Sequence, residues 1–314
     1  MIRKATPLLV ILAALALIVP VQMKVDAVRL EHKLTPAGEE RAGRSAVEVI
    51  ATVGLGGFRG LAVDYLWFRT MQMQAERRYY EIALLCQLIL KMEPYFPQIW
   101  AFHAWNMAYN ISVETPDKEG RWRWIEQSLD ILEGENQGLA LNGDSYVLYW
   151  ELGWIYYHRC TPKGRDDHGR YFASQVARRH ASRRREGEGA LSVVFRLAEE
   201  NFRAAAEKDD ISPLMRRRAQ GMAVHAMEAR GDWAGAEREW LRLIDESPLD
   251  EDTARNGLNN FYMGIIFRYH AQGNAEESRR WFGRLQKHFP EHTLSYEETL
   301  KQAGRELGDI MGRE

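Results

Sequence analysis

The segment Leu141-Asn-Gly-Asp-Ser-Tyr-Val-Leu-Tyr-Trp-Glu-Leu-Gly-Trp-Ile-Tyr-Tyr-His158 decides how the chain folds. Its spacing predicts a helix in which Tyr149, Leu152 and Tyr156 share one face, because residues three and four apart are neighbours on a helix. Gly153 lies beside these residues and has no side chain, so a second helix can approach closely there. The segment therefore predicts one half of a tightly packed helix pair.

The order Tyr149-x₂-Leu152-Gly153-x₂-Tyr156 resembles W-x₂-L-G-x₂-Y, which opens a tetratricopeptide repeat (TPR), with tyrosine in place of tryptophan. A second stretch has the same organisation near the end of the chain. Residues 262–269 form its first apolar helix pattern, Gly273-Asn274 its turn, and Pro290 closes its second helix. The resemblance to TPR proteins extends over residues 58–290.

Because each TPR unit is a helix–turn–helix, the resemblance implies an all-α fold: an α-solenoid of about five TPR-like units over residues 58–290. An insertion, residues 160–189, separates the two helices of the third unit. The polar residues 291–314 are expected to form a C-terminal capping helix, because the last unit of a repeat stack needs a polar outer face.

The start of the chain predicts a membrane anchor. Residues 5–23 carry no charge and approach the length of about 20 apolar residues that a membrane-spanning helix needs. A cleaved signal peptide is the alternative, but Val19-Pro-Val-Gln-Met-Lys24 offers no convincing cleavage site of small residues. We expect residues 1–24 to be an uncleaved transmembrane signal anchor and residues 25–57 to be a juxtamembrane connector.

The charges that flank the apolar run bear on membrane topology. The positive-inside rule keeps Arg3 and Lys4 in the cytoplasm, which places the body of this single-pass protein on the periplasmic side of a bacterial membrane. Lys24, Arg29 and Lys33 lie on the opposite flank and weaken that orientation. A cytoplasm-facing assembly factor with the same fold is therefore an alternative.

Composition argues against several functional classes. The formal net charge of −2 gives no overall attraction to nucleic acid, so no nucleic-acid partner is expected. The two cysteines, Cys86 and Cys160, lie in apolar helical patterns and form no Cys-x-x-Cys motif. A disulfide framework and a structural zinc site are therefore not predicted. We expect the two thiols not to be bonded to each other, and we expect no cofactor.

First helices of TPR units line the concave face of the stack, and the resemblance implies which side chains point into it. Most of them are aromatic here, and an open apolar surface rich in Trp and Tyr is typical of protein-binding sites. The alternative is that these rings pack on one another, or on the insertion, as additional core. The residues expected to form the partner-binding groove are Trp67, Met71, Trp105, Tyr109, Trp150, Trp154, Tyr157, His158, His225, Phe267 and His270.

The insertion, residues 160–189, contains a basic run, Arg178-Arg-His-Ala-Ser-Arg-Arg-Arg185. Such a run can contact anionic lipid or nucleic acid. We interpret it instead as part of a solvated, mobile excursion from the repeat stack.

An enzyme is the alternative functional class: a helical hydrolase or a metal-dependent catalyst that uses His158, Asp167 and His168. The order of Asp166, Asp167 and His168 relative to His158 and Cys160 matches no established metal-ligand spacing. The chain also lacks the H-E-x-x-H and G-x-S-x-G motifs. We therefore expect no catalytic residues and no bound metal. The sequence predicts a membrane-anchored TPR scaffold or adaptor that binds a peptide or helix of a protein partner.

Overall fold

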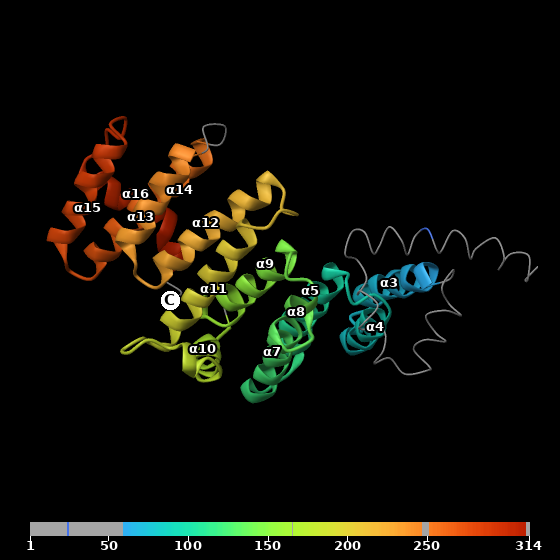
Figure 1. The fold of residues 1–314 in the computed structure, drawn as a ribbon. Helices are drawn as coiled ribbons and strands as arrows, with labels where there is room; N and C mark the ends of the chain where they lie inside the picture. The colour runs from blue at the N-terminus through green and yellow to red at the C-terminus, as the bar shows by residue number, and fades with distance from the viewer. Residues whose placement is uncertain (1–23, 25–58, 165, 247–250, 312–314) are drawn as a thin grey trace, which may run out of the picture. The chain divides into compact units, whose positions relative to one another are not determined.

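The structure is a computed structural model, and it describes residues 24, 59–164, 166–246 and 251–311 (Figure 1). Within these residues the regular elements are all helices, so the predicted all-α class is confirmed for this part of the chain. Of the predicted anchor, residues 1–24, only Lys24 is among the described residues, and the predicted connector, residues 25–57, lies outside them. Among the described helices, none has both the length and the apolar character that a membrane crossing requires.

The chain divides into two compact units, Met1–Glu151 and Leu152–Glu314, which we call unit 1 and unit 2. The division falls inside helix α9 (Tyr146–Trp154), close to Gly153. Unit 1 contains α3 (Arg59–Ala75), α4 (Tyr79–Met92), α5 (Pro97–Trp105), the π-helical η2 (Asn106–Ile111), α6 (Ser112–Glu114), α7 (Lys118–Glu133), α8 (Gly138–Leu141) and most of α9.

In unit 1, helices that follow each other in sequence pack side by side. Helix α3 packs on α4, α4 packs on α5 and η2, and α7 packs on α5 and η2. Pro94 follows the end of α4, and Pro97 begins α5, as expected of a residue that cannot continue a helix but fits its first turn. The side chain of Asp117 caps α7 by accepting a 2.6 Å hydrogen bond from the Gly120 backbone N–H.

Unit 2 contains longer helices that also pack on their neighbours in sequence. Helix α11 packs on α10 and α12, α13 packs on α12 and α14, and α14 packs on α15 and α16 (Figure 1). The helices are α10 (Gly169–Arg179), α11 (Ala190–Ala206), α12 (Pro213–Ala229), α13 (Trp233–Glu246), α14 (Glu251–Ala271), α15 (Ala275–His288) and α16 (Tyr296–Met311), preceded by the π-helical η3 (Ile155–Arg159) and accompanied by the short 3₁₀ helices η4 (Pro162–Gly164) and η5 (Ala181–Arg183).

The tight turns of unit 2 are made by glycines with positive φ. Gly231 has φ of 84° between α12 and α13, and Gly273 has φ of 77° between α14 and α15. Glycine adopts this conformation without the steric cost that other residues pay. Asn274 then caps α15, accepting a hydrogen bond from the Glu277 backbone N–H at 3.2 Å. The turn predicted at Gly273-Asn274 is confirmed.

Gly153 lies at a close helix–helix contact, as its sequence context predicts. A Cβ atom added at Gly153 of α9 would lie 3.0 Å from the ring of Phe202 on α11. That distance is shorter than an ordinary van der Waals contact, so a side chain at this position would displace the ring. The pairing of these two helices, predicted across the insertion, is therefore present.

The interpretation of residues 160–189 as a solvated excursion is wrong for most of the segment. Residues 169–179 form α10, which buries Phe172 and Val176 against α11 because these residues recur on one face of the helix. The Arg159 guanidinium also lies 2.6 Å from the Asp166 carboxylate, and both side chains are buried. Only the turn at residues 181–187 is exposed throughout.

Candidate binding surfaces

Helices α5 and α9 each change from α to π conformation directly after a tryptophan. Helix α5 ends at Trp105 and continues as η2, while α9 ends at Trp154 and continues as η3. Single-turn π segments inside α-helices are rare and occur often at functional sites. The two junctions correspond in sequence, because each tryptophan lies five residues after another aromatic residue, Trp100 in α5 and Tyr149 in α9.

At each junction the tryptophan ring stacks on the side chain four residues later. The Trp105 and Tyr109 rings have centroids 6.3 Å apart with an interplanar angle of 28°. The Trp154 and His158 rings have centroids 5.0 Å apart and are nearly parallel, at 7°. All four side chains are half-buried, so part of each stacked pair remains open to a ligand.

In unit 1 the stacked pair extends into a longer aromatic row. Trp67 of α3 meets the edge of Phe102 of α5 at a centroid distance of 5.1 Å, and Phe102 lies 6.0 Å from Trp105. We call Trp67, Phe102, Trp105 and Tyr109 the aromatic row. Phe102 was not among the residues predicted from the sequence, although it lies three residues before Trp105 and therefore on the same helix face.

Polar groups are enclosed without partners in the helices that carry these aromatic side chains. His103 is fully buried on α5 and neither ring nitrogen has a hydrogen-bond partner. Burial lowers the pKa of His103 to about 4, because the charged ring would be desolvated. Glu151 is half-buried, but its Oε1 atom is enclosed without a partner, and burial raises its pKa to about 8.

Met71 is an exposed residue of α3, one helical turn after Trp67. It is exposed, together with Leu61, Tyr65 and Phe68, at the three- and four-residue spacing of one face of α3. Helix α4 carries a similar exposed apolar face formed by Tyr80, Leu84 and Leu88. Trp150, the remaining predicted residue of this unit, is half-buried on α9.

In unit 2, Trp154 and His158 are joined by Tyr157. The Tyr157 ring lies 6.3 Å from Trp154 and meets the edges of Phe195 and Phe202 at 5.8 and 6.4 Å. Because Phe195 and Phe202 are buried in α11, Tyr157 connects the half-buried aromatic pair to the core.

The last predicted groove residues lie apart from that cluster. His225 contacts the Glu228 carboxylate at 3.1 Å and the Trp240 ring edge at 5.5 Å. Phe267 packs against α16, where a Cβ atom at Gly304 would lie 3.1 Å from its ring. His270 is exposed, beside the Tyr296 hydroxyl. Helix α16 thus covers part of the face that the sequence analysis expected to be open at Phe267.

A cavity of about 510 Å³ lies among α12, α13 and α14, and the sequence analysis did not predict it. We call it the arginine pocket. Its lining combines an apolar floor with basic and amide side chains. The lining residues are Leu214, Arg217, Arg218, Gln220, Gly221, Met222, His225, Trp240, Leu243, Thr253, Ala254, Asn256, Gly257 and Asn260.

The residues of the alternative enzyme hypothesis are placed as follows. Asp166 pairs with Arg159 and accepts a hydrogen bond from the His168 backbone N–H at 2.9 Å. Asp167 is exposed, and His158 stacks on Trp154. In the part of the chain that the structure describes, no group of His, Cys, Asp and Glu side chains has the arrangement of a metal site.

Both cysteines are free thiols in the interior, Cys86 in unit 1 and Cys160 in unit 2. Burial raises the pKa of Cys86 to about 12. Its reactive thiolate form is therefore scarce at neutral pH.

Comparison of the chain with protein-family models, with curated proteins and with solved structures yields no match.

Proposed function

We propose that this protein is a membrane-anchored, TPR-like adaptor that binds a peptide or helix of a protein partner. The aromatic row of unit 1 forms the binding surface. The observation that carries the proposal is that Trp67, Phe102, Trp105 and Tyr109 are in ring contact and yet all half-buried. Large aromatic side chains normally gain most from complete burial, so a contiguous row left partly open is best explained by a partner that completes it.

The chemistry of the row favours a polypeptide ligand. Trp and Tyr are enriched among residues that dominate protein–protein binding energy, because they offer large apolar area with few rotatable bonds. The stacked Trp154–His158 pair repeats this arrangement at the next α-to-π junction. Recurrence of the feature at corresponding places supports a role in binding beyond the packing of a single helix.

The adaptor proposal also includes the repeat architecture and the anchor. Consecutive helices that pack as neighbours, with glycine turns at Gly231 and Gly273, support a stack of helix–turn–helix units. The uncharged run at residues 5–23 supports a single-pass anchor, and Arg3 and Lys4 favour a periplasmic body. The anchor would hold the partner complex at the membrane.

Two matched variants test the proposal. Trp105→Ala removes a half-buried ring from the aromatic row, while Trp233→Ala removes a half-buried ring from α13, where it lies 6.4 Å from Phe261. Tagged full-length chains are purified from detergent extracts, and captured proteins are quantified by mass spectrometry. We expect one set of proteins to be captured by the wild type and by Trp233→Ala, and at least tenfold less of it by Trp105→Ala, because a hot-spot Trp contributes about 2 kcal/mol or more.

Circular dichroism on both variants provides the control for folding. If Trp105→Ala retains the helical signal and captures the same proteins as the wild type, the aromatic row is not the binding surface.

A further inference from the structure

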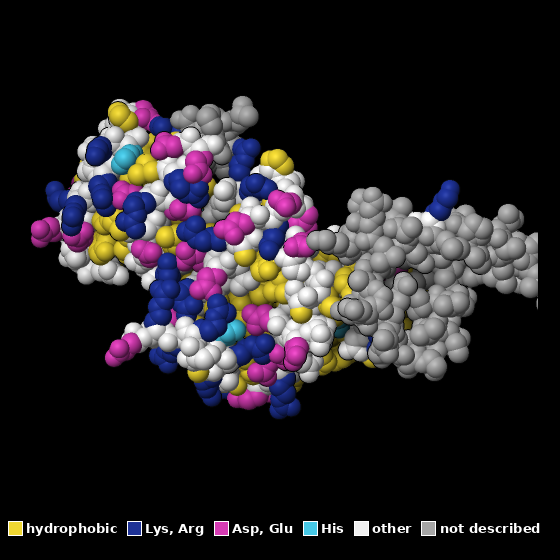
Figure 2. Space-filling view, in the orientation of Figure 1, with side chains coloured by type: hydrophobic (Ala, Val, Ile, Leu, Met, Phe, Trp, Pro, Cys, Tyr) yellow, Lys and Arg dark blue, Asp and Glu magenta, His cyan; other side chains and the backbone are white. Residues whose placement is uncertain are grey.

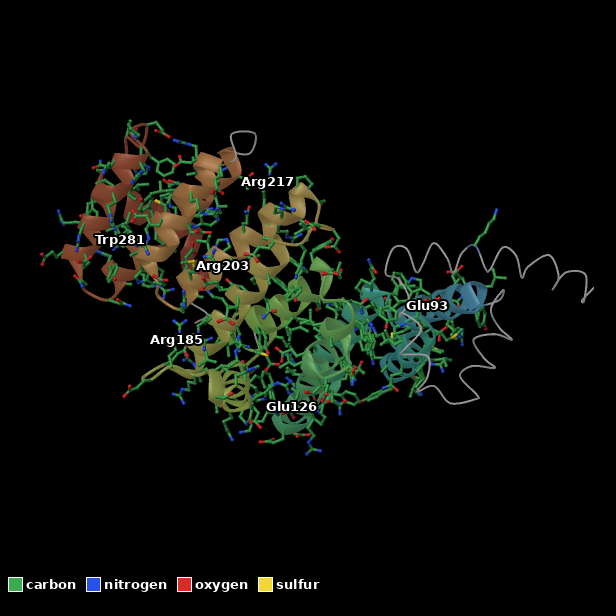
Figure 3. The ribbon with its side chains drawn as sticks, viewed as in Figure 1. Glu93, Glu126, Arg185, Arg203, Arg217 and Trp281 are labelled. Atoms are coloured by element: carbon green, nitrogen blue, oxygen red, sulfur yellow. The ribbon has the colours of Figure 1, made fainter. Side chains whose placement is uncertain are left out.

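Helix α10 and the turn that follows it form a strongly basic part of unit 2. Residues 169–185 contain six arginines and neither Asp nor Glu, although the whole chain has a formal net charge of −2. We call residues 169–185 the basic segment. The connection between α10 and α11 extends away from the helices that it joins (Figure 1), and Arg185, labelled in Figure 3, lies on it. Positive charge is therefore concentrated in one short part of the chain.

Three of these arginines are exposed without a partner. They are Arg170 and Arg178 of α10 and Arg185 of the turn, and within the described residues their guanidinium groups form no hydrogen bond or ion pair. Arg170 and Arg178 are eight residues apart, so they lie on the same side of α10. The opposite side buries Phe172 and Val176 against α11. The amphipathic character of α10 therefore directs two cations away from the core.

The turn that carries Arg185 is fixed by a buried ion pair. The Glu188 side chain accepts hydrogen bonds from the Arg196 guanidinium at 2.8 and 3.0 Å and from the Arg185 backbone N–H at 3.1 Å. Arg196 also donates a 3.0 Å hydrogen bond to the Arg183 carbonyl, and the Arg183 guanidinium pairs with Glu200 at 2.5 Å. The Arg185 guanidinium makes none of these bonds. A turn ordered in advance loses little conformational entropy when it binds a partner.

The chemistry of the segment favours phospholipid headgroups over nucleic acid. Sites for single-stranded nucleic acid combine basic side chains with aromatic rings on which the bases stack. The aromatic residues of the basic segment are Tyr171 and Phe172. Phe172 is buried, and the Tyr171 ring meets it at a centroid distance of 5.8 Å. A cluster of arginines without open stacking rings is instead typical of a surface that contacts an anionic bilayer, whose charge resides on phosphate groups.

We propose that the basic segment binds anionic phospholipid headgroups at the membrane surface, with Arg170, Arg178 and Arg185 as the principal contacts. The planar guanidinium group forms paired N–H···O hydrogen bonds with phosphate oxygens, and it is more weakly hydrated than an ammonium group. The inference rests on the proposed function only in placing the chain at a membrane. It assigns to unit 2 a lipid contact that is separate from partner binding by the aromatic row.

Fluorescence quenching by lipid headgroups tests the inference on the full-length chain. Ser182→Cys, at an exposed position in the turn, is labelled with a thiol-reactive fluorophore, while the native Cys86 and Cys160 are buried and react slowly. The labelled chain is reconstituted into phosphatidylcholine vesicles that contain a headgroup spin-labelled lipid, with or without about 30% phosphatidylglycerol. We expect at least twofold stronger quenching in the anionic vesicles, because the segment then lies against the headgroups.

Salt provides a second readout on the same labelled chain. Raising the salt concentration from about 0.05 to about 0.5 M shortens the screening length to about 4 Å. The difference in quenching between anionic and neutral vesicles should then disappear, since the contact is electrostatic.

Charge-neutralising variants locate the contact. The triple variant Arg170→Gln, Arg178→Gln, Arg185→Gln should lose the additional quenching in anionic vesicles. Each arginine near such a surface contributes about fivefold to binding, so the loss of three weakens the contact about 100-fold. The charge-matched control removes three exposed arginines from other helices and should keep the quenching of the wild type. Its substitutions are Arg123→Gln, Arg238→Gln and Arg280→Gln.

Three outcomes would overturn the inference. The first is equal quenching in neutral and anionic vesicles, a comparison that needs no arginine variant. The second is an equal loss of quenching in the two triple variants when circular dichroism shows both to be folded. The third is release of the label from anionic vesicles by a mixed-sequence RNA oligonucleotide at the same phosphate concentration, which would indicate a nucleic-acid surface.

The same vesicles separate this inference from the proposed function. Flotation of the chain with neutral vesicles reports the anchor, and capture of partner proteins reports the aromatic row. If the chain does not float with neutral vesicles, the anchor is refuted, while quenching in anionic vesicles still reports the basic segment. Equal quenching in both kinds of vesicle with retained flotation and capture would refute the lipid contact alone.

Discussion

Unit 1 and unit 2 differ in the apolar surface that their described residues expose and in the buried charged pairs that they contain. The described residues of unit 1 expose apolar faces on α3 and α4, and they enclose His103 without a hydrogen bond. Among the described residues of unit 2, Leu214 is the exposed large hydrophobic side chain, and on the face drawn in Figure 2 many Lys, Arg, Asp and Glu side chains are interspersed over this unit. Among the described residues, exposed large apolar side chains are therefore concentrated in unit 1.

Buried charge in unit 2 is compensated by ion pairs. Arg196 is nearly buried and bonds to the Glu188 carboxylate at 2.8 Å and to Glu200 at 2.9 Å. Hydrogen bonds from Arg196 hold the pKa of Glu188 at about 2, far below its ordinary value. Arg203 on α11, labelled in Figure 3, similarly lies 3.1 Å from Glu199 and 3.0 Å from Glu239 of α13.

The largest effect is expected from breaking the buried pair in unit 2. Arg196→Met should destabilise the protein by about 3–5 kcal/mol, because it leaves the buried Glu188 carboxylate without its cation. The control is Arg242→Met on the exposed part of α13, where loss of ion pairs should cost less than about 1 kcal/mol. Urea denaturation of the full-length chain measures both. Equal costs for the two variants would show that the buried pair is not what distinguishes unit 2.

The next effect concerns the unpaired histidine of unit 1. His103 has an ordinary pKa of 6.5 when unfolded and about 4 when folded, so between these values the unfolded chain binds more protons. The unfolding free energy that the neutral His103 contributes is complete above pH 6.5. It falls by about 3 kcal/mol in total as the pH falls from 6.5 towards 4. The difference in unfolding free energy between wild type and His103→Leu, measured from pH 7 to pH 4, should follow this curve.

Glu151 changes the unfolding free energy with pH in the opposite direction. It does so in wild type and in His103→Leu alike, so its effect cancels in their difference. The pKa of Glu151 is raised from 4.5 to about 8, so its contribution to the unfolding free energy falls as the pH rises from 4.5 towards 8 in wild type and variant alike. A wild-type minus His103→Leu difference that is flat between pH 6.5 and 4 would show that His103 is hydrated or paired.

A smaller effect is expected at the α9–α11 contact. Gly153→Leu should lower the unfolding free energy by about 1–3 kcal/mol, because its side chain meets the Phe202 ring. Gly221→Ala is the matched control, since its Cβ atom has ordinary van der Waals distance to Trp240. Thermal melts followed by circular dichroism compare the two. An unchanged melting temperature for Gly153→Leu would place Phe202 elsewhere.

The smallest effect is expected on the exposed face of α3. Tyr65→Ser combined with Phe68→Ser should change the unfolding free energy by less than about 0.5 kcal/mol per site, because these side chains are exposed. Leu129→Ala, at a fully buried position in the same unit, should cost about 2–5 kcal/mol. If the serine variants cost as much as Leu129→Ala, the apolar face of α3 is part of the core of unit 1.

Local sequence rules predicted the features that depend on neighbouring residues. Gly273 marks a helix end because glycine adopts a positive φ that other residues rarely adopt. Gly153 was identifiable because it interrupts an apolar face. These constraints act within a few residues and can be read without knowledge of the fold.

Features that depend on distant residues were missed. The insertion appeared solvated because its basic run outweighs its apolar residues, yet Phe172 and Val176 find cover on α11. Phe267 was expected to be open, but α16 lies against it. The arginine pocket requires α12, α13 and α14 together, and only the paired glycines 221 and 257 signal it in the sequence.

Site-specific photocrosslinking tests the central claim most directly. The photoreactive amino acid p-benzoylphenylalanine replaces Trp67, Trp105 or, as the control, Trp233 in the full-length chain, and native membranes are irradiated. The account predicts that positions 67 and 105 form covalent adducts with the same protein partner and that position 233 does not. Adducts of equal yield at all three positions, or no intermolecular adduct at 67 and 105, would contradict it.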